Sequence, residues 1–359
     1  MVAPPKRPSV HEALSLVAPG RPLRAGLDRI LQGRMGALIV VGDSPQVLAI
    51  STGGFLLDAE VTAQRLSELA KMDGAIVTSS DATRIARANV HLVPNSSTPT
   101  SETGTRHRSA ERVARSLGVV VIAVSEELRM VTVYWGNDKR VLEPVTQLWT
   151  RTNQLLQTLE RFRGRVDVAA SSLSSLEVAD LVTVRDVAEA VQRAEMSIRV
   201  AKQIEEHLVE LGEEGAMLKL QLDELTSGLD ALYRLIIRDF LPDNKAKTME
   251  TVLNKLESMT MEEIADVGKV AISLKLVEDA DGMAQPLSSK GLRILSRLPK
   301  LPGSVANDIV DYFGSLQRVM RATEDDLGEV AGVGEARARS VKEGLARITE
   351  ASIIDRYRN

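Results

Sequence analysis

The sequence contains no cysteine and only four histidines among its 359 residues. The absence of cysteine excludes disulfide bonds, thiolate zinc sites and a cysteine nucleophile. No two histidines stand at a metal-ligand spacing such as H-E-x-x-H, so we do not expect a zinc site built on histidine. A chain without cysteine also fits a reducing compartment.

Long apolar runs are missing as well. The longest, Ala37–Val41 and Val119–Val124, are far shorter than the roughly 20 residues of a membrane-spanning helix. No apolar segment follows Lys6 and Arg7, so we expect no signal peptide and a cytoplasmic protein without membrane association. The sequence also lacks the G-x-x-x-x-G-K-S/T loop, which argues against a P-loop ATPase.

Positive charge and aromatic residues are both in short supply. The 45 basic residues stand against 49 acidic ones, for a net charge of -4. This balance argues against binding of nucleic acid by the whole surface, so any contact with DNA must be local. Aromatic residues make up only 3% of the chain, so its cores must be mainly aliphatic.

Residues from about 11 to 145 alternate between strand-like and helix-like patterns. Short apolar or alternating segments predict strands at 37–41, 47–50, 75–77, 119–124 and 130–135. Apolar residues spaced by three and four predict helices at 61–71, 82–88 and 109–117. Buried strands separated by helices predict an α/β domain in which helices cover a sheet.

Residues from about 146 to 285 read as helical almost throughout. Apolar residues follow helical spacing from Val187 to Ala201, and a leucine stripe continues from Leu208 to Leu232, interrupted by Gly212 and Gly215. This pattern predicts an all-α linker or spine. Residues 203–230 hold eight acids against one lysine, which is a poor surface for DNA.

Residues 286–359 change character again, with 12 basic against 10 acidic side chains. Lys290, Arg293, Arg297 and Lys300 fall close together in the sequence. Two glycine-containing motifs, 301–305 and 331–334, each precede a helical pattern. Glycine allows a tight turn and a close approach of the backbone, and the helix start offers unpaired N–H groups to a phosphate. We therefore expect an all-α module that contacts the sugar-phosphate backbone of DNA without reading its bases.

Over about 60 residues this region resembles tandem helix-hairpin-helix DNA-binding domains. The candidate DNA contacts are Gly303, Gly332, Val333, Gly334, Arg337, Arg339 and Lys342. Glu335 opposes them because its carboxylate repels phosphate.

The segment from Glu102 to Ser109 has an unusual charge pattern. Arg106, His107 and Arg108 stand in the first turn of the helix that it opens, where the helix dipole favours anions. A bound phosphate would remove this conflict, because arginine matches phosphate oxygens with paired hydrogen bonds. An isolated group of this kind is more often a solvated basic turn.

A second motif, Asp73-Gly74-Ala75, precedes a predicted strand. An Asp-Gly pair is usually a turn. Its functional interpretation is a carboxylate that holds a divalent metal, with two small residues that leave room for a base or a sugar. Mg²⁺ typically takes one or two carboxylates together with substrate phosphates.

Four stretches carry a resemblance to a known family: Gly53–Phe55, Lys71–Ala75, Ala88–Leu92 and Glu102–Glu111. They resemble the diadenylate cyclase domain, which would occupy residues 11–145. With a helical linker at 146–285 and the hairpins at 286–359, the whole chain resembles the family of bacterial DNA integrity scanning proteins. Its most specific feature is the order of the Asp-Gly-Ala and Arg-His-Arg motifs, about 30 residues apart.

The resemblance implies that the chain condenses two ATP molecules into the second messenger cyclic di-AMP and releases two pyrophosphates. It implies Mg²⁺ or Mn²⁺ as cofactor, with Asp73 beside the metal and the attacking ribose hydroxyl. The implied catalytic residues are Asp73, Arg106, His107 and Arg108. The implied ATP-binding residues are Gly74, Ala75, Leu92, Thr105, Arg106, His107, Arg108, Ser109 and Ser125.

The resemblance also implies partners. These are branched DNA, bound without sequence specificity in the bacterial nucleoid, and further copies of the chain in a homo-octamer. Because one pocket holds one ATP, two cyclase domains must face each other.

Two other functions stay open from the residues alone. A DNA-binding scaffold with an inactive nucleotide pocket would explain the hairpins and the long helices but not Asp73 or the cationic helix start. A nuclease would need clustered carboxylates for two metals, and the sequence offers Asp73 without an evident second ligand.

Overall fold

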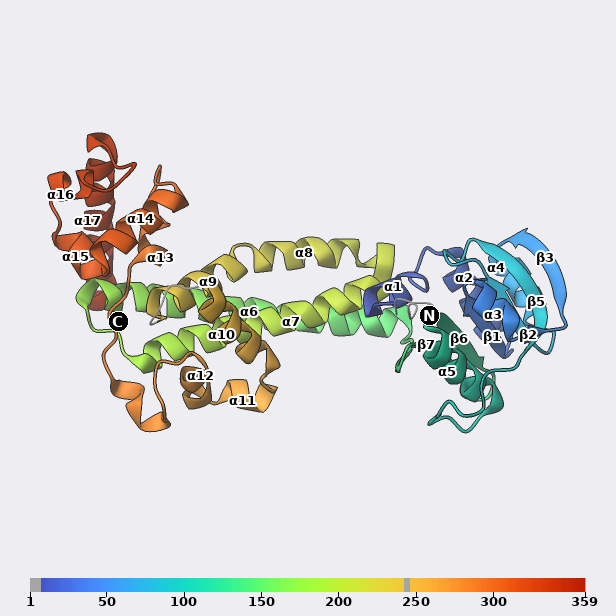
Figure 1. Cartoon of the computed structure of the whole chain (residues 1–359). Coiled ribbons are helices and arrows are strands. Elements are labelled where there is room, and N and C mark those ends of the chain that lie inside the picture. Colours follow the sequence, from blue (N-terminus) through green and yellow to red (C-terminus); the bar gives the residue numbers. More distant parts are fainter. Residues whose placement is uncertain (1–7, 242–245, 359) are drawn as a thin grey trace. The chain divides into compact units, whose positions relative to one another are not determined.

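The computed structural model describes residues 8–241 and 246–358 (Figure 1). It divides into two compact units, each of which is described separately below. The first comprises the chain up to residue 154 together with residues 203–221. The second comprises residues 155–202 and the chain from residue 222 onward.

The first unit is built on a mixed β-sheet. Its strands run in the order β2-β5-β4-β1-β6-β7-β8, and β3 also pairs with β5. Only the β1–β4 pair is parallel among the paired strands that the structure describes. The strands are β1 (Ala37–Val41), β2 (Ser51–Thr52), β3 (Phe55–Glu60), β4 (Ala75–Thr78), β5 (Arg84–Leu92), β6 (Val120–Ser125), β7 (Met130–Trp135) and β8 (Asp138–Val141).

Helices cover both faces of this sheet, drawn in blue to teal in Figure 1. They are α1 (Val10–Ser15), α2 (Pro22–Gln32), α3 (Pro45–Ala49), α4 (Ala63–Leu69) and α5 (Thr105–Leu117). Because side chains alternate along a strand, Ile39 joins the core under α1, α2 and α4, whereas Val40 joins the core under α3 and α5. Both layers are almost wholly aliphatic. The predicted α/β domain is confirmed.

Two predicted elements within this domain are wrong. Residues 47–50, predicted as a strand, lie mostly in helix α3, which starts after a Ser44 cap with Pro45 in its first turn. Residues 82–88, predicted as a helix, run into strand β5, where they pair with both β3 and β4. In each case contacts with the sheet, which a short local pattern does not contain, decide the conformation.

The predicted helical linker is confirmed. The helices of this region are α6 (Val145–Ala179), α7 (Val184–Leu211), α8 (Ala216–Thr226), α9 (Leu229–Phe240), α10 (Ala246–Ser258), α11 (Met261–Ala265) and α12 (Val267–Ser273), with 3₁₀ turns η1 (Gly212–Gly215) and η2 (Ala280–Ala284). The interruption expected at Gly212 and Gly215 is η1. Within the second unit, one aliphatic core joins α6, α7, α9, α10 and α12 around residues such as Leu173, Val187, Ile236 and Val252.

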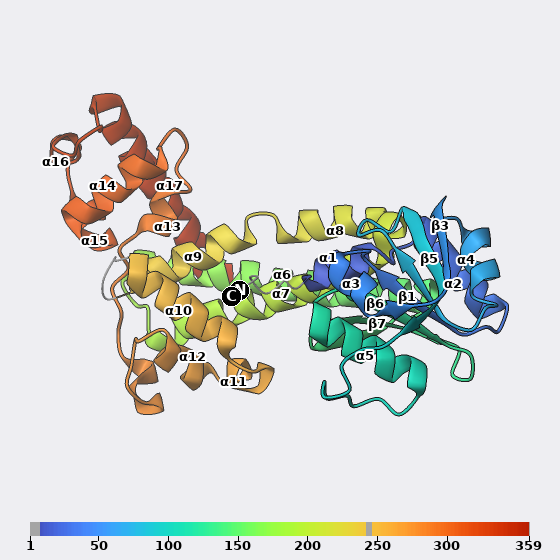
Figure 2. The same cartoon turned by 45° about the vertical axis from the view of Figure 1, so that its right-hand side comes forward.

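The C-terminal module is all-α, as predicted. Its helices are α13 (Leu292–Leu295), α14 (Gly303–Phe313), α15 (Leu316–Arg321), α16 (Glu324–Gly328) and α17 (Glu335–Arg358), grouped together in both views (Figures 1 and 2). Their core includes Leu295, Ile309, Val319 and Val341, and it is continued by Val178 of α6 and Leu235 of α9. This module therefore packs on the linker helices of its own unit. The predicted division of the chain at 145/146 and 285/286 stays a prediction.

No helix in the described part of the chain is both long and apolar enough to cross a membrane.

Candidate functional site

The candidate nucleotide residues lie together where the central strands of the sheet end. This end of the strands is called the site edge below. Strand β1 pairs with β4 through Leu38 and Ala75, and with β6 through Ala37 and Val124. Gly36 directly precedes β1, the Asp73-Gly74 turn directly precedes β4, and Ser125 is the last residue of β6, so all of them lie at the same end of these strands. The end of β5, which includes Leu92, runs to the same edge because β5 is antiparallel to β4.

Helix α5 brings its N-terminus to this edge. A carbon atom added at Gly36 would lie 2.3 Å from the Arg106 guanidinium. This guanidinium therefore lies against the backbone just before β1. Thr105 and Arg108 are exposed, and Ser109 is half-buried. Gly104, the N-cap residue, has no side chain with which to cap the first turn. The helix start therefore presents N–H groups, hydroxyls and guanidinium groups to a ligand at the edge.

His107 turns away from its two arginine neighbours and toward the sheet. Its Nδ1 lies 2.7 Å from the Tyr134 hydroxyl on β7. That hydroxyl donates to Glu102 Oε1 at 3.1 Å, and Lys139 Nζ donates to the same oxygen at 2.6 Å. Burial lowers the pKa of His107, and the hydrogen bond from Lys139 lowers the pKa of Glu102. At neutral pH His107 is therefore a neutral imidazole, Tyr134 is a phenol and Glu102 is a carboxylate.

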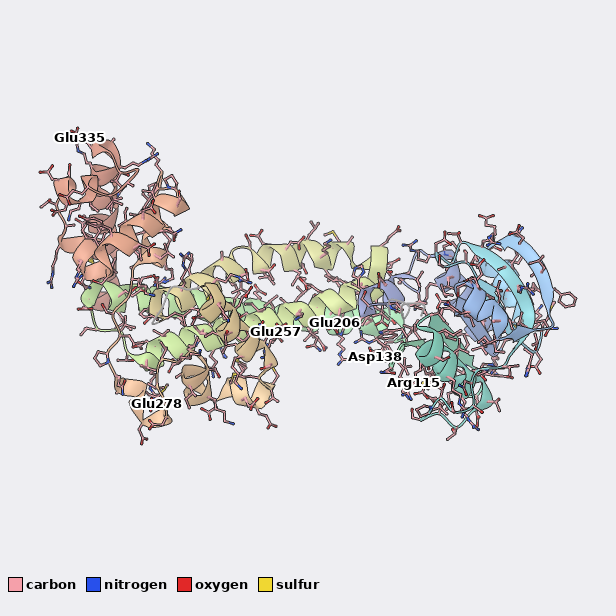
Figure 3. The ribbon with its side chains drawn as sticks, viewed as in Figure 1. Arg115, Asp138, Glu206, Glu257, Glu278 and Glu335 are labelled. Atoms are coloured by element: carbon pink, nitrogen blue, oxygen red, sulfur yellow. The ribbon has the colours of Figure 1, made fainter. Side chains whose placement is uncertain are left out.

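A buried carboxylate that the sequence interpretation missed holds the loop before α5. Glu111 accepts hydrogen bonds from the Ser101 backbone and hydroxyl and from the Thr100 hydroxyl, and it pairs with Arg115 at 2.7 Å. Burial opposes the charge, but these donors outweigh burial and hold the pKa of Glu111 below its ordinary value. Arg115 is labelled on α5 in Figure 3. An acid and a base four residues apart on a helix was the available signal, but it does not show that the pair is buried.

The Asp73-Gly74 turn is shaped by close packing against β5. Gly74 adopts φ +139°, and a Cβ there would come within 2.8 Å of Asn89. Asn89 itself has φ 53° inside β5, a conformation that few non-glycine residues adopt. Asp73 is exposed, and no hydrogen bond or ion pair of its carboxylate occurs among the described residues. Its oxygens are therefore open to a ligand.

The donors at this edge suit a metal that substrate helps to bind. In the described ranges, no group of three His, Asp or Glu side chains could enclose a metal ion. Asp73 offers one accessible carboxylate, and Mg²⁺ is commonly held by one or two carboxylates with substrate phosphates. The Asp73 carboxylate therefore fits a metal ion that substrate phosphates help to hold.

The two hairpin motifs lie at helix starts in the C-terminal module. Gly303 is the first residue of α14, and Gly332, with φ +79°, precedes Gly334 and α17. Val333 is buried in the module core, so its backbone alone can reach a partner. Glu335 opens α17 on an exposed surface, where Figure 3 labels it.

The basic candidates of this module differ in what they contact. Arg337 donates to the Gly332 carbonyl at 2.6 Å and supports the turn, while exposed Arg339 lies 3.7 Å from Glu324. Lys342 donates to the carbonyls of Met320 and Ala322, at the end of α15. Its ammonium group therefore stabilises a helix end, as expected for a cation at that position.

Arg293, one of the four basic residues grouped in the sequence, is buried inside the second unit. Its side chain is 1% exposed and pairs with Glu177 of α6, which is 0% exposed. It also donates to Ser174 Oγ at 3.0 Å. Asp239 of α9 accepts the backbone N–H groups of Leu292 and Arg293 and caps α13. This polar cluster fastens the hairpin module to the linker helices.

Comparison with known proteins agrees with a nucleotide site on an α/β domain. Residues 24–139 match the nucleotide-binding domain of the DisA bacterial checkpoint controller, and residues 142–281 match the linker region of that controller. The fold and the site thus define a protein of the diadenylate cyclase class.

Full-length relatives extend the match to the C-terminal module. The DNA integrity scanning protein DisA of Kineococcus radiotolerans is 50% identical over 349 residues, which is 97% of each chain. The protein of the same name from Streptomyces avermitilis is 48% identical over 351 residues, 97% of this chain and 94% of the relative. The chain belongs to the family of DNA integrity scanning proteins DisA. Membership confirms both the predicted family and the predicted enzyme class, a diadenylate cyclase.

Proposed function

We propose that the chain joins two ATP molecules at the sheet edge described above and that its hairpin module senses the structure of DNA. The observation that carries this proposal is that Asp73, Ser125 and the start of α5 lie at the same end of the strands, where the Arg106 guanidinium lies against Gly36. An acidic and a cationic group at one edge suit an attacking hydroxyl and a triphosphate.

The reaction is a phosphoryl transfer in which positioning and charge neutralisation do most of the work. The 3′-oxygen of one ATP attacks the α-phosphorus of the other, the bond from that phosphorus to pyrophosphate breaks, and the hydroxyl proton passes to water. The same step in the opposite direction closes the ring. Arg106 and Arg108 neutralise the charge that grows on the phosphate oxygens.

The remaining candidates hold the substrate. Thr105 and Ser109 offer hydroxyl donors to the phosphates, beside the N–H groups of the first turn. Gly74 meets the adenosine through its backbone, because Asn89 fills the space that a Cβ would take, and the buried side chains of Ala75 and Leu92 support the pocket from the core. Ser125 contacts the nucleotide from the end of β6.

Asp73 is the residue that would hold Mg²⁺ or Mn²⁺ together with the phosphates. When bound, such an ion makes a hydroxyl more acidic and polarises the phosphoryl group. The Asp73 carboxylate also orients the ribose hydroxyl of the attacking ATP.

Two pockets must face each other, because one pocket holds one ATP. Phe55 and Leu56 are 56% and 75% exposed on β3, a strand that pairs only with β5 among the strands that the structure describes. Large exposed apolar side chains on an outer strand are candidates for contact with a second cyclase domain. We propose that cyclase domains associate in facing pairs within a homo-octamer.

The hairpin turns at Gly303 and Gly332–Gly334 hold the DNA backbone, with Arg337 and Arg339 near the second turn. Contacts of this kind recognise shape more than sequence, so branched DNA in the nucleoid is the proposed ligand. The relatives named above are called DNA integrity scanning proteins, which supports this proposal. Lys342 supports DNA binding indirectly, because its ammonium group stabilises the end of α15.

The test is to incubate the protein with ATP and Mg²⁺ and to detect cyclic di-AMP by mass spectrometry. Asp73→Asn should abolish the product and keep ATP binding. Asp138→Asn, an exposed carboxylate on β8 that Figure 3 labels, is the matched control and should behave as the unchanged protein. Normal turnover by Asp73→Asn would remove Asp73 from the mechanism.

Arg106→Ala should weaken ATP binding, and unchanged affinity would count against its phosphate role. A folded oligomer that binds ATP and forms no product would favour the DNA-binding scaffold instead.

A further inference from the structure

Both ring nitrogens of His107 are closed to a ligand. Nδ1 is hydrogen-bonded to Tyr134 at 2.7 Å. Nε2 is buried, and no hydrogen-bond partner for it occurs in residues 8–241 and 246–358. The flanking residues differ, because Arg108 is exposed and the Arg106 guanidinium rests on Gly36 at the sheet edge.

The hydrogen bonds determine which nitrogen carries the proton. Glu102 is a carboxylate that already accepts a bond from Lys139, so it can only accept from Tyr134. The single hydroxyl proton of Tyr134 is thus donated to Glu102, and the hydroxyl oxygen accepts from His107. Nδ1 must therefore be the protonated nitrogen, and Nε2 carries a lone pair.

A phosphate could bind His107 only if Nε2 became accessible and were protonated. The lone pair at Nε2 repels phosphate oxygens until the ring is protonated. Burial opposes protonation, as do the positive charges of Arg106 and Lys139, whereas Glu102 favours it. The tyrosine hydroxyl is neutral, because burial and Glu102 raise its pKa. The charged groups around the ring thus include two cations and one anion, and the ring stays neutral.

We propose that His107 is a positioning residue that acts through Tyr134 and Glu102, and that it does not bind the triphosphate. The bond from Nδ1 ties the first turn of α5 to strand β7. Through Glu102 the same network ties down the loop that leads into α5. His107 thereby orients the start of α5, from which Arg106 and Arg108 reach the substrate. This inference rests on the proposed function only in taking that helix start as the phosphate site.

Two isosteric replacements separate this role from direct binding. The amide nitrogen of asparagine lies where imidazole has Nδ1, and that of glutamine lies where imidazole has Nε2. The probe is 3′-deoxy-ATP, which lacks the attacking hydroxyl and cannot turn over, titrated calorimetrically with Mg²⁺.

His107→Asn should keep the dissociation constant within about threefold of the unchanged protein, whereas His107→Gln and Tyr134→Phe should each raise it about tenfold, the upper range for one lost hydrogen bond. The double variant Tyr134→Phe/His107→Gln should be no weaker than either single variant, because both changes break the same bond.

The opposite pattern overturns the proposal. If His107→Gln keeps the affinity while Tyr134→Phe has no effect, Nε2 binds the phosphate directly. A gain in affinity below pH 6.5 that His107→Asn abolishes would also show a protonated imidazole on the phosphate.

Measurements without nucleotide test the positioning role of His107 independently of the proposed cyclase function. In protein labelled with ¹⁵N at its four histidines, the signal that His107→Asn removes should show protonation at Nδ1 and none at Nε2. Hydrogen exchange of residues 99–110 should rise in Tyr134→Phe and His107→Gln and stay slow in His107→Asn. Failure of the unchanged protein to bind 3′-deoxy-ATP would refute the proposed function. A His107 protonated at Nε2, or uniform exchange in all variants, would refute the positioning role.

Discussion

Replacement of Arg293 by methionine tests how the hairpin module is held on the linker. Methionine keeps much of the apolar stem and removes the guanidinium from a pair in which Arg293 is 1% and Glu177 is 0% exposed. Glu177 would be left buried with Ser289 as its remaining side-chain donor among those described. Removal of one partner from a buried ion pair typically costs about 3–5 kcal/mol, so we expect a loss of that size in the free energy of unfolding.

The cost should depend on pH, and its sign follows from Glu177. Burial raises the pKa of this carboxyl even beside Arg293, and loss of the cation raises it further. In the variant the folded state therefore binds more protons than the unfolded state above the ordinary glutamate pKa. Its stability should fall as the pH rises through that range, so the difference from the unchanged protein is larger at pH 8 than at pH 5.

Urea unfolding can show that this loss of stability occurs in the second structural unit and not in the first. Both tryptophans, Trp135 and Trp149, belong to the first unit, so their fluorescence reports that unit while circular dichroism reports all helices. Arg293→Met should lower the circular dichroism midpoint and leave the fluorescence midpoint in place. The control is Arg234→Met, which breaks an exposed pair with Asp230 (54% and 69% exposed) and should cost less than about 1 kcal/mol. Equal costs for the two variants would refute the reasoning.

Three further predictions follow from the contacts. Burial lowers the pKa of His207, so the unfolded state binds more protons below pH 6.5. The fluorescence midpoint should therefore fall on acidification from pH 7 to 5, and His207→Asn should flatten that dependence if the assignment is right. Gly36→Ala should displace the Arg106 guanidinium, since the added carbon would lie 2.3 Å from it, and weaken ATP binding about as much as Arg106→Ala; calorimetry showing normal affinity would contradict this. Lys342→Met should lower the circular dichroism midpoint, because α15 loses the donor to two carbonyls, and an unchanged midpoint would assign Lys342 to DNA alone.

The sequence by itself determined the class of each region. Long periodic patterns predicted the α/β domain, the linker helices and the all-α C-terminal module. These patterns suffice because burial of a regular apolar face dominates the choice between helix and strand in long segments. The Asp-Gly-Ala and Arg-His-Arg motifs also predicted the enzyme family, since their order and spacing are specific.

Tertiary structure decided the short elements and the use of polar side chains. Residues 47–50 and 82–88 took the opposite conformation to their local pattern, because neighbouring strands and caps outweigh the propensity of a few residues. Arg293 and His107 look like surface cations in the sequence, yet one is buried beside Glu177 and the other is turned toward Tyr134. A charged residue is assigned to solvent or core by partners that lie far away in the sequence, over 100 positions for Arg293. Only the folded chain brings those partners together.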